Sequence, residues 1–380
     1  MGHLQALSLL VLASLVSSAA PPPSGSGYRF TLTHINSRGG FTKPELMRPG
    51  QAEYLMELAI GTPPVPFCQP CKLCFPQDTP VYDPTASSSF SPLTCSSNAC
   101  LPVWSRGCAP SSLCGYRYAY GDGSHSAGVL GTETLTFGSG PGQVPAGFAG
   151  AVAFGCGRDN GGDWYNSTGL VGFGRGSLSL VAQLGFGKFS YCLTDFFNTS
   201  LGSHVSFGSL AELAHGGGTA VQSTPLGISL GDALLPIPNQ TFELRADGTG
   251  GMIVDSGTIF TVLVESAFGV VANHVAEVLD QPALNTRSLD SPCFPAPAGV
   301  RQLPAMPDMV LHFAGGADMR LHGGNYMSFN EEDSSFCLNI VGTTSPSSSV
   351  LGNFQQQNIQ MLFDITVGKL SFVPTDCSKL

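Results

Sequence analysis

The sequence predicts an all-β protein with minor helix, organised as two lobes, and three observations lead to this prediction. The chain has 380 residues, more than a single hydrophobic core usually serves. Only 11% of the residues are charged, whereas 42% are hydrophobic. The 48 glycines and 28 prolines are spread over the whole length, as expected for many short strands joined by tight turns.

The N-terminal segment has the pattern of a secretory signal peptide. An apolar run from Leu4 to Val16 is followed by small residues up to Ala20. A membrane anchor is the alternative, but the run is short for a bilayer and no second apolar stretch of spanning length follows. We therefore expect residues 1–19 to be a signal peptide and the protein to be secreted to the extracellular space or cell wall, with the vacuole as an alternative.

Cysteines and glycosylation sequons agree with an oxidising compartment. Twelve cysteines, an even number, allow up to six disulfides. Three Asn-X-Ser/Thr sequons predict N-glycosylation, at Asn166, Asn198 and Asn239. The final Ser378-Lys379-Leu380 matches a peroxisomal address, but an ER signal acts first, so we treat the match as coincidence.

The charge pattern argues against several classes of partner. The formal net charge is −10, and no cluster of Lys and Arg could neutralise phosphates or anionic lipid. The sequence also lacks a phosphate-binding loop, a zinc helix of the His-Glu-x-x-His type and a Gly-x-Ser-x-Gly nucleophile turn. We expect no nucleic-acid partner, no membrane partner, no cofactor and no metal.

Changes in composition suggest the domain organisation. A Pro/Ser/Gly stretch and a small basic group follow the signal, and apolar alternation from Tyr54 to Ile60 then starts the folded body with a strand. An Ala/Gly-rich passage later in the chain is the best linker. The expected units are a pro-segment remnant (20–50), an N-terminal lobe with a cysteine-rich insertion (51–207), a linker (208–224) and a C-terminal lobe (225–380).

Strand signals dominate both expected lobes. Further strands are expected at 128–137, 151–155, 189–193 and 204–207. Helical periodicity is clear only from Ala267 to Leu279. There the apolar positions expected on one face are Phe268, Val271, Val275, Val278 and Leu279.

An internal echo suggests that the two lobes are related. Leu170-Val171-Gly172 and Val350-Leu351-Gly352 each place two apolar residues directly before glycine. Such triplets also occur by chance in a Gly-rich β protein, so their meaning depends on what precedes each of them.

The residues before the second triplet can carry chemistry. An apolar strand, Met252-Ile253-Val254, delivers Asp255 into a tight turn formed by Ser256, Gly257 and Thr258. Backbone N–H groups and the two hydroxyls of this turn can hydrogen-bond the carboxyl group. An ordinary Asx turn at a strand end is the alternative interpretation.

With their surroundings, these residues resemble the pepsin-like aspartic proteases, and in particular the plant nepenthesin-type branch. Asp255-Ser256-Gly257-Thr258 and Val350-Leu351-Gly352 are similar to the active-site loop and crossing strand of that family's C-terminal lobe. Tyr118 to Ser124 resembles the flap hairpin, with Tyr120 as the flap tyrosine followed by Gly121. The resemblance implies a bilobal fold, two six-stranded-type β lobes with a cleft between them, and acid proteolysis of extended peptides bound in the cleft.

The resemblance also implies the cysteine pairing, which spacing alone cannot choose. Seven cysteines fall in the place of that branch's cysteine-rich insertion. A zinc site at Cys68, Cys71 and Cys74 is the alternative, without a nearby histidine to complete it. The implied disulfides are Cys68–Cys71, Cys74–Cys156, Cys95–Cys114, Cys100–Cys108, Cys192–Cys377 and Cys293–Cys337.

The sequence departs from the family in one respect that bears on activity. A pepsin-like enzyme needs two facing carboxylates, one from each lobe. The order Asp-Ser/Thr-Gly occurs only at 255–257, and Phe67 runs directly into Cys68 where the family places Asp-Thr-Gly-Ser. The chain is also short after Met47 and after Leu226, which indicates either an incomplete gene model or a real loss.

Two functions therefore stay open at this point. The first is an aspartic endopeptidase in which Asp255 is one catalytic carboxylate. The sequence supports this function only in part, because the second catalytic aspartate is lacking. The second is a non-catalytic protein-binding or glycosidase-inhibitor-like protein on the same fold, as in the related cereal xylanase inhibitors. In both cases we expect a monomer with a protein or peptide partner.

Overall fold

The computed structural model describes most of the chain outside its N-terminal part. The described residues are 8–12, 27–34, 54–61, 82–103, 106–108, 112–121, 123–137, 147–162, 167–198, 200–214, 218–221, 225–238, 240–283, 291–344 and 348–380.

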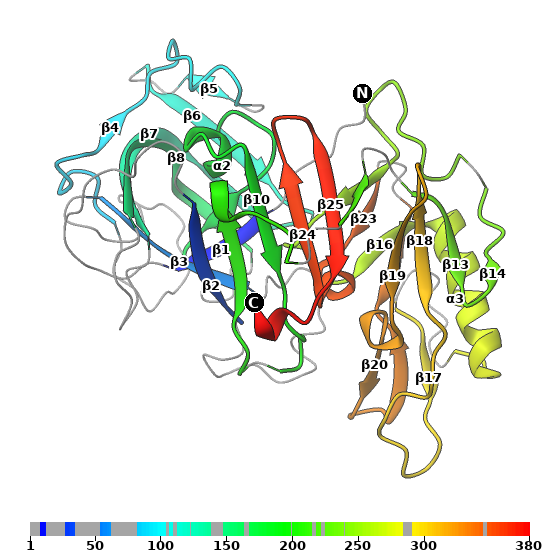
Figure 1. Cartoon of the computed structure of the whole chain (residues 1–380). Coiled ribbons are helices and arrows are strands. Elements are labelled where there is room, and N and C mark those ends of the chain that lie inside the picture. The colour runs from blue at the N-terminus through cyan, green and yellow to red at the C-terminus, as the bar shows by residue number, and fades with distance from the viewer. Residues whose placement is uncertain are drawn as a thin grey trace.

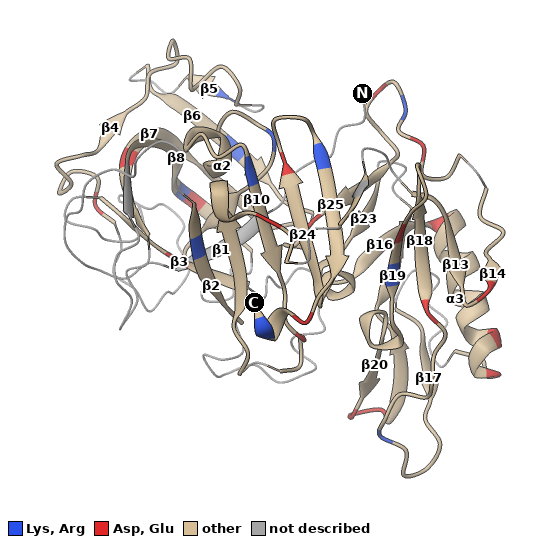
Figure 2. Cartoon of the chain, in the orientation of Figure 1, with Lys and Arg blue, Asp and Glu red and all other residues tan. Residues whose placement is uncertain are grey.

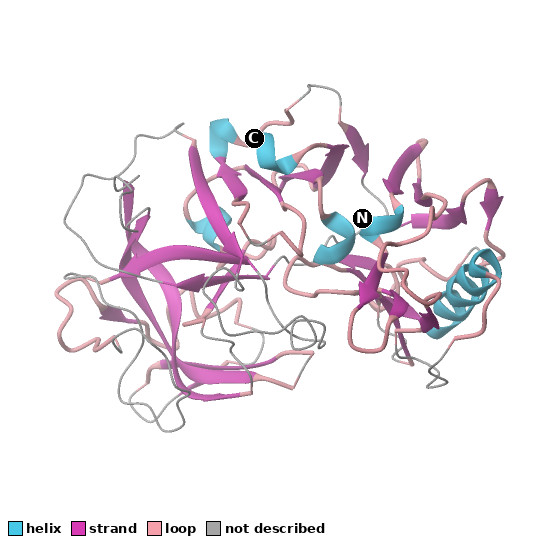
Figure 3. Cartoon of the chain, turned by 90° about the horizontal axis from the view of Figure 1, so that it is seen from below, coloured by secondary structure: helices cyan, strands magenta, loops and turns pink. Residues whose placement is uncertain are grey.

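Strands make up nearly all of the regular structure, so the predicted all-β class is confirmed. Figure 1 shows two halves, with N-terminal elements on one side and β13 to β23 on the other. In the part of the chain that the structure describes, Figure 3 shows a longer helix at the edge of the C-terminal half and otherwise only short helical turns.

A 14-stranded sheet forms the N-terminal half and the centre of the described structure. Its main path runs β12-β25-β24-β10-β11-β2-β3-β7-β6-β5. The main-path strands are β2 (Tyr28–His34), β3 (Tyr54–Ile60), β5 (Gly107–Cys108), β6 (Cys114–Ala119), β7 (His125–Phe137), β10 (Lys188–Cys192), β11 (Ser203–Phe207), β12 (Thr219–Val221), β24 (Ile359–Asp364) and β25 (Lys369–Pro374). β1 (Ser8–Leu12), β4 (Ser91–Pro92), β8 (Gly147–Gly161) and β9 (Leu170–Gly172) pair off this path.

The last two strands of the chain join the two halves. β24 pairs antiparallel with β10, so that Tyr191 lies opposite Met361, and β25 continues the sheet on the other side of β24. In Figure 1 these strands stand side by side in the middle of the molecule. The C-terminal segment is therefore part of the same sheet as the N-terminal half.

Three smaller sheets form the rest of the C-terminal half, in the orders β14-β13-β18-β19, β15-β23-β16-β22 and β17-β21-β20. Their strands are β13 (Pro225–Leu230), β14 (Ala233–Leu234), β15 (Met252–Val254), β16 (Thr261–Val264), β17 (Cys293–Pro295), β18 (Met309–Phe313), β19 (Ala317–Leu321), β20 (Met327–Asn330), β21 (Ser335–Leu338), β22 (Ile340–Thr343) and β23 (Ser349–Leu351). Short helical segments are α2 (Leu180–Gln183), η2 (Gly208–Leu210), η3 (Gly323–Asn325), η4 (Asn353–Gln356) and η5 (Cys377–Lys379).

The predicted helix is present as α3 (Glu265–Leu279) and contacts β16 and β22. Phe268, Val271 and Val275 are buried and Leu279 is partly buried, as their spacing predicts, and Ala267 is buried as well. The assignment of Val278 to the same face was wrong, because this side chain is 45% exposed. The helix ends at Asp280 in the left-handed conformation, with φ 51°.

The predicted strands are confirmed, and several are longer than expected. The long hairpin of β7 and β8 includes both 128–137 and 151–155, because cross-strand pairing continues well beyond the apolar runs. Two strands lie in N-terminal segments for which no strand was expected. β1 falls within the expected signal peptide (1–19), and β2 falls within the expected pro-segment remnant (20–50). The expected linker contains η2 and β12. Among the described residues, no helix is long and apolar enough to cross a membrane.

Four disulfides are resolved with both partners, and two of them differ from the implied pairing. Cys192–Cys377 and Cys293–Cys337 are present. In the insertion, however, Cys95 pairs with Cys108 and Cys100 with Cys114, which corrects the implied Cys95–Cys114 and Cys100–Cys108. Burial explains the correction, since Cys100 and Cys114 share a core cluster whereas Cys108 is exposed and Cys95 is only partly covered.

The remaining cysteine and glycosylation predictions are only partly covered by the described residues. Cys156 is disulfide-bonded, while Cys68, Cys71 and Cys74 lie outside the described residues. Asn198 is exposed, and its side-chain oxygen accepts a hydrogen bond from Ser200. Asn166 and Asn239 lie outside the described residues.

Candidate active site around Asp255

Asp255 lies at the end of β15, in the C-terminal half. β15 pairs parallel with β23, and the Asp255 backbone N–H donates to the Leu351 carbonyl at 3.1 Å. The apolar strand predicted to deliver the acid is thus held in place by the second apolar-apolar-Gly triplet. The two motifs that the sequence analysis connected lie side by side.

The turn after Asp255 fixes the orientation of the carboxylate. Gly257 N–H donates to Oδ1 at 2.9 Å, and the Thr258 hydroxyl donates to Oδ2 at 2.8 Å. Asp255 is half-buried. Each oxygen therefore has a donor from the turn, as the sequence predicted for Gly257 and Thr258.

The crossing strand approaches this turn so closely that only glycine fits. A Cβ at position 352 would lie 2.3 Å from the Ile259 carbonyl oxygen. Directly after Gly352, Asn353 N–H donates to the Thr258 carbonyl at 2.7 Å and Phe354 N–H to the Ile259 carbonyl at 3.0 Å. Gly352 is thus required by backbone packing.

The expectation that the Ser256 hydroxyl also bonds the Asp255 carboxylate was wrong, because this hydroxyl has no hydrogen-bond partner. Ser256 is only 3% exposed, and its hydroxyl has no hydrogen-bond partner. Asn353 is fully buried; its amide nitrogen donates to the Ser256 carbonyl at 3.0 Å, while its own Oδ1 also lacks a partner. Buried polar groups are rarely left unpaired. Two buried polar groups without a partner therefore lie at this one turn.

A tyrosine from the N-terminal half reaches this site through a glutamine. The Tyr191 hydroxyl on β10 donates to Gln356 Oε1. Gln356 Nε2 donates to the Leu351 carbonyl at 2.8 Å and to the Asp255 carbonyl at 3.5 Å. Burial raises the pKa of Tyr191, and the negative charge of Asp255 raises it further, so the hydroxyl stays protonated.

The predicted flap residues lie at the end of a hairpin in the N-terminal half. β6 and β7 form this hairpin, and its tip is closed by Tyr120 N–H donating to Ser124 O at 2.9 Å. Tyr120 is half-buried, Gly121 is exposed, and the Tyr120 ring stacks on Tyr118 with centroids 6.4 Å apart. The structure thus places Tyr120 and Gly121 at the end of a hairpin, and their role as a flap stays a prediction.

The N-terminal half lacks the counterpart of the Asp255 strand among its described strands. In the C-terminal half, β23 lies between β15, which is parallel to it, and β16, which is antiparallel. The related triplet of the N-terminal half, Leu170-Val171-Gly172, forms β9. Among the described strands β9 pairs only with β1, and this pairing is antiparallel. No described strand lies parallel to β9, where the symmetry would place a strand that carries the first acid. The junction of Phe67 and Cys68 lies outside the described residues.

Glu133 is a buried acid of the N-terminal half, but it is engaged elsewhere. It is fully buried on β7 and accepts hydrogen bonds from Tyr82 at 2.6 Å, Ser89 at 2.6 Å and Ser87. Both of its oxygens are thus occupied by donors that hold the segment around 82–89 against β7. Glu133 is an anchor of that segment and not a partner for Asp255.

A serine, a histidine and an aspartate also line up on the C-terminal half. Ser229 Oγ lies 2.6 Å from His312 Nε2, and His312 Nδ1 lies 2.8 Å from Asp318 Oδ1. These distances would suit a hydrolase relay, but Ser229 lies within β13, which pairs with a strand on each side. A nucleophile needs an exposed turn and free N–H donors nearby. His312 is therefore a structural histidine with a partner at each ring nitrogen.

Among the described residues, no group of three or more His, Cys, Asp or Glu side chains could hold a metal ion. The alternative zinc site at Cys68, Cys71 and Cys74 lies outside them.

Two family models together match most of the chain. A model described as xylanase inhibitor N-terminal matches residues 54–209, and one described as xylanase inhibitor C-terminal matches residues 225–374. The chain is 40% identical to aspartic proteinase nepenthesin-1 of Nepenthes gracilis, over 86% of this chain and 79% of the relative. It is 38% identical to nepenthesin-2 of the same species (90% and 82%) and 33% identical to aspartyl protease family protein 2 of Arabidopsis thaliana (91% and 76%).

The chain therefore belongs to the pepsin-like aspartic proteases of the nepenthesin type, which are related to the xylanase inhibitors. Solved structures with the same fold include edgp, with a TM-score of 0.69 at 16% identity over 94% of this chain and 97% of that one. Basic 7S globulin from soybean gives a TM-score of 0.67 at 17% identity over 92% and 97%. These low identities establish the fold alone, and the fold is bilobal.

Sequence reasoning missed three residues of this site. Asn353 and Gln356 closely follow the Val350-Leu351-Gly352 triplet, but the sequence analysis assigned them no role. Tyr191 was only part of an expected strand. A run of glutamines in an otherwise apolar segment was the available signal, because buried amides must find partners.

Proposed function

We propose that this protein is an aspartic endopeptidase by descent in which Asp255 is one catalytic carboxylate, and that the chain does not hydrolyse peptides as it stands. The observation that carries the proposal is the Asp255 turn, which is fully formed while the adjacent Ser256 hydroxyl lacks a partner. The Asp-Ser/Thr-Gly order that would supply a second such turn is absent from the rest of the sequence.

The chemistry explains why one turn is insufficient. Two carboxylates that share one proton let one acid accept the proton of the attacking water while the other polarises the scissile carbonyl. Loss of one member of an acid/base pair lowers the rate by about 10²–10⁴. A lone Asp255 also lacks the second anchor that holds the water.

The binding mode follows from the same fold. An extended peptide would lie between the halves, under the Tyr120 hairpin, and would add to strand edges through main-chain hydrogen bonds. We further propose a secreted, glycosylated monomer without a nucleic-acid or membrane partner, with lobes at 51–207 and 225–380. Figure 2 supports the absence of a nucleic-acid or membrane partner, since the Lys and Arg residues in the described part of the chain are few and scattered over both halves.

A second candidate is a binding or inhibitory protein on the same scaffold. Two observations favour it. Both halves match family models described as xylanase inhibitor domains, and the sequence has only one Asp-Ser/Thr-Gly. In this case the chain would bind a protein partner without cleaving it. Incubation with endoxylanases tests this candidate directly, because inhibition of xylan hydrolysis supports it and unchanged hydrolysis removes its main support.

The decisive experiment compares the protein with its present sequence and a repaired protein with an insertion. The repaired chain carries an apolar strand and an Asp-Thr-Gly-Ser turn inserted after Phe67. We expect acid-dependent cleavage of a denatured protein substrate only by the repaired chain, and its loss in the repaired Asp255→Asn variant. Cleavage by the unrepaired chain that Asp255→Asn abolishes would refute the proposal and point to two Asp255 residues meeting in a dimer.

A further inference from the structure

Three consecutive glutamines follow the crossing strand, and all three are buried. Gln355 and Gln356 are fully buried and Gln357 is 5% exposed. A buried amide must satisfy an acceptor and two donor hydrogens, so each of them has to bind other polar groups. Their partners differ, and the differences separate their roles.

Gln355 bonds only within the C-terminal half. Its Oε1 accepts from the Thr261 N–H at 2.9 Å and from the Thr261 hydroxyl at 2.8 Å. Its Nε2 donates to the carbonyls of Asn325 and Asn339. Gln355 thus ties β16 to the segments before β20 and β22.

Gln357 connects the two halves away from the acid. Its Oε1 accepts from the Phe196 N–H at 2.6 Å, and its Nε2 donates to the Phe354 carbonyl at 2.8 Å. The Leu193 carbonyl accepts from the next residue, Asn358. None of these bonds involves the Asp255 turn.

Gln356 connects the two halves at the acid itself. Its side chain receives the Tyr191 hydroxyl from β10 and donates to the carbonyls of Leu351 and Asp255. The Leu351 carbonyl is also the acceptor for the Asp255 N–H. A displacement of this one amide would therefore disturb the Leu351 carbonyl, which holds the Asp255 N–H, and the contact with the carbonyl of Asp255 itself.

We propose that Gln356, held by the Tyr191 hydroxyl, is a positioning residue for Asp255 that fixes the acid relative to the sheet of the N-terminal half. It does not touch the reacting atoms, and it acts through the backbone on either side of the carboxylate. The expected effect of Gln356 on kcat rests on the proposed function. Its expected effect on the hydrogen exchange of the Asp255 turn does not.

The structural consequence can be measured in the full chain as it exists. In Tyr191→Phe we expect the amide hydrogens of Asp255 and Gly257 to exchange with solvent about fivefold faster, the factor that corresponds to the loss of one ordinary hydrogen bond. Gln356→Met should give the same change. In the double variant the two effects should not add, because both changes break the same connection.

Gln357→Met is the matched control, since it breaks an equally buried link between the halves without touching the Asp255 turn. We expect faster exchange of the Phe196 amide and unchanged exchange of the Asp255 and Gly257 amides. Equal effects of Tyr191→Phe and Gln357→Met on the Asp255 amide would refute the inference, as would no effect of Tyr191→Phe.

The repaired chain supplies a second readout. There Tyr191→Phe should lower kcat about fivefold with little change in KM, because the substrate still binds while the acid is displaced. Gln357→Met should leave kcat unchanged. If the repaired chain is inactive, the proposed function fails while the exchange result still decides the positioning role. An unchanged kcat in a repaired chain that cleaves would overturn that role in catalysis.

Discussion

At the scale of single residues, Ser256 allows the energetic cost of a buried hydroxyl without a partner to be measured. Its hydroxyl is buried without a partner, and such a group costs about 1–3 kcal/mol of stability. We therefore expect Ser256→Ala to leave the free energy of unfolding of this chain unchanged or to raise it by about 1 kcal/mol. Urea unfolding at neutral pH measures this change.

Ser203→Ala is the control for that substitution. Ser203 is 1% exposed, but its hydroxyl accepts from the Thr194 N–H at 2.9 Å and lies 3.0 Å from the Thr194 hydroxyl. The same substitution should there lower stability by about 1–3 kcal/mol. If Ser256→Ala destabilises as strongly as Ser203→Ala, then the Ser256 hydroxyl has a partner in solution and its assignment as unpaired is wrong.

His34 should make stability depend on pH. It is 2% exposed, its ring meets Tyr54 and Phe196 edge-on, and burial lowers its pKa from 6.5 to about 4. The unfolded chain therefore binds a proton near pH 6.5 that the folded chain does not bind until about pH 4. Stability falls as pH falls through this window, by up to about 3 kcal/mol.

His34→Phe isolates this contribution because it keeps an aromatic ring between Tyr54 and Phe196. As pH falls from 7 to 4.5, the protein with His34 should lose more of its free energy of unfolding than the His34→Phe variant does. Burial also lowers the pKa of His204, which contributes in the same direction in both proteins. A parallel decline in both proteins would show that His34 titrates normally.

At the scale of elements, the cysteine-rich insertion contains two disulfides of similar loop length and different burial. Cys95–Cys108 and Cys100–Cys114 span 13 and 14 residues, so the chain-entropy contribution of each is nearly the same, about 3 kcal/mol. Only Cys100 and Cys114 pack in a core cluster, with Val103 and Leu130. Any difference between them must come from packing.

We therefore expect replacement of both Cys100 and Cys114 by serine to cost about 1–3 kcal/mol more than replacement of Cys95 and Cys108, because it buries hydroxyls in an apolar cluster. Thermal unfolding compares the two double variants. Peptide mapping without reduction checks the pairing itself, and a Cys95–Cys114 peptide would restore the pairing implied by the family.

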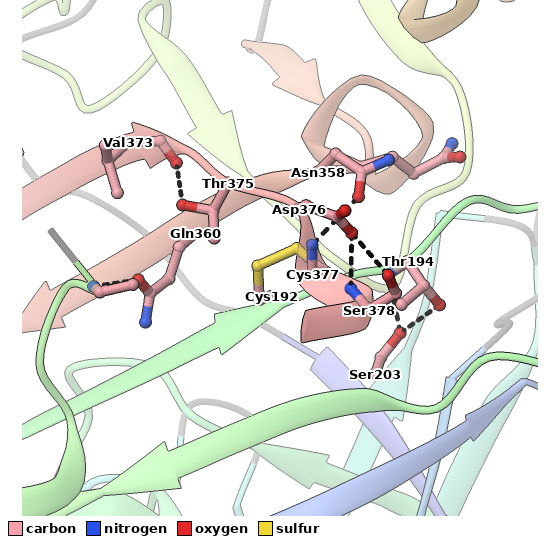
Figure 4. The surroundings of a disulfide bond; sticks show 12 residues. Cys192, Thr194, Ser203, Asn358, Gln360, Val373, Thr375, Asp376, Cys377 and Ser378 are labelled. Atoms are coloured by element: carbon pink, nitrogen blue, oxygen red, sulfur yellow. Dashed lines mark hydrogen bonds between the residues drawn. A yellow bond between two sulfur atoms is a disulfide. The ribbon is translucent and has the colours of Figure 1, made fainter. Parts of the chain in front are cut away.

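For the molecule as a whole, the Cys192–Cys377 disulfide ties the end of the chain to the central sheet. Figure 4 shows it beside η5, where Asn358 Oδ1 accepts from the Cys377 N–H at 3.2 Å. It closes a loop of 185 residues that includes the whole C-terminal half. By the chain-entropy model its removal costs on the order of 5 kcal/mol.

Replacement of Cys192 and Cys377 by serine should accordingly destabilise the protein more than the same change at Cys293 and Cys337. That disulfide spans 44 residues, for which the model gives about 4 kcal/mol. Denaturant unfolding of the two double variants measures the difference. A larger loss at Cys293 and Cys337 would show that the C-terminal half, and not the connection between halves, limits stability.

The sequence by itself determined the all-β class, the positions of several strands, helix α3 and the Asp255 turn. Each of these depends on local physics: alternation specifies a half-buried strand, helical spacing specifies α3, and a strand that ends in Asp-Ser-Gly-Thr specifies its own hydrogen bonds. The absence of a second Asp-Ser/Thr-Gly is likewise a property of the sequence alone.

Only the tertiary structure decided which distant groups meet. Spacing could not choose between the two cysteine pairings, because burial of Cys100 and Cys114 depends on how β5 and β6 pack. Tyr191 and Gln356 are 165 residues apart and meet only because β24 pairs with β10. Likewise, the unpaired state of the Ser256 hydroxyl depends on which groups the folded chain places around it, and no local pattern encodes that arrangement.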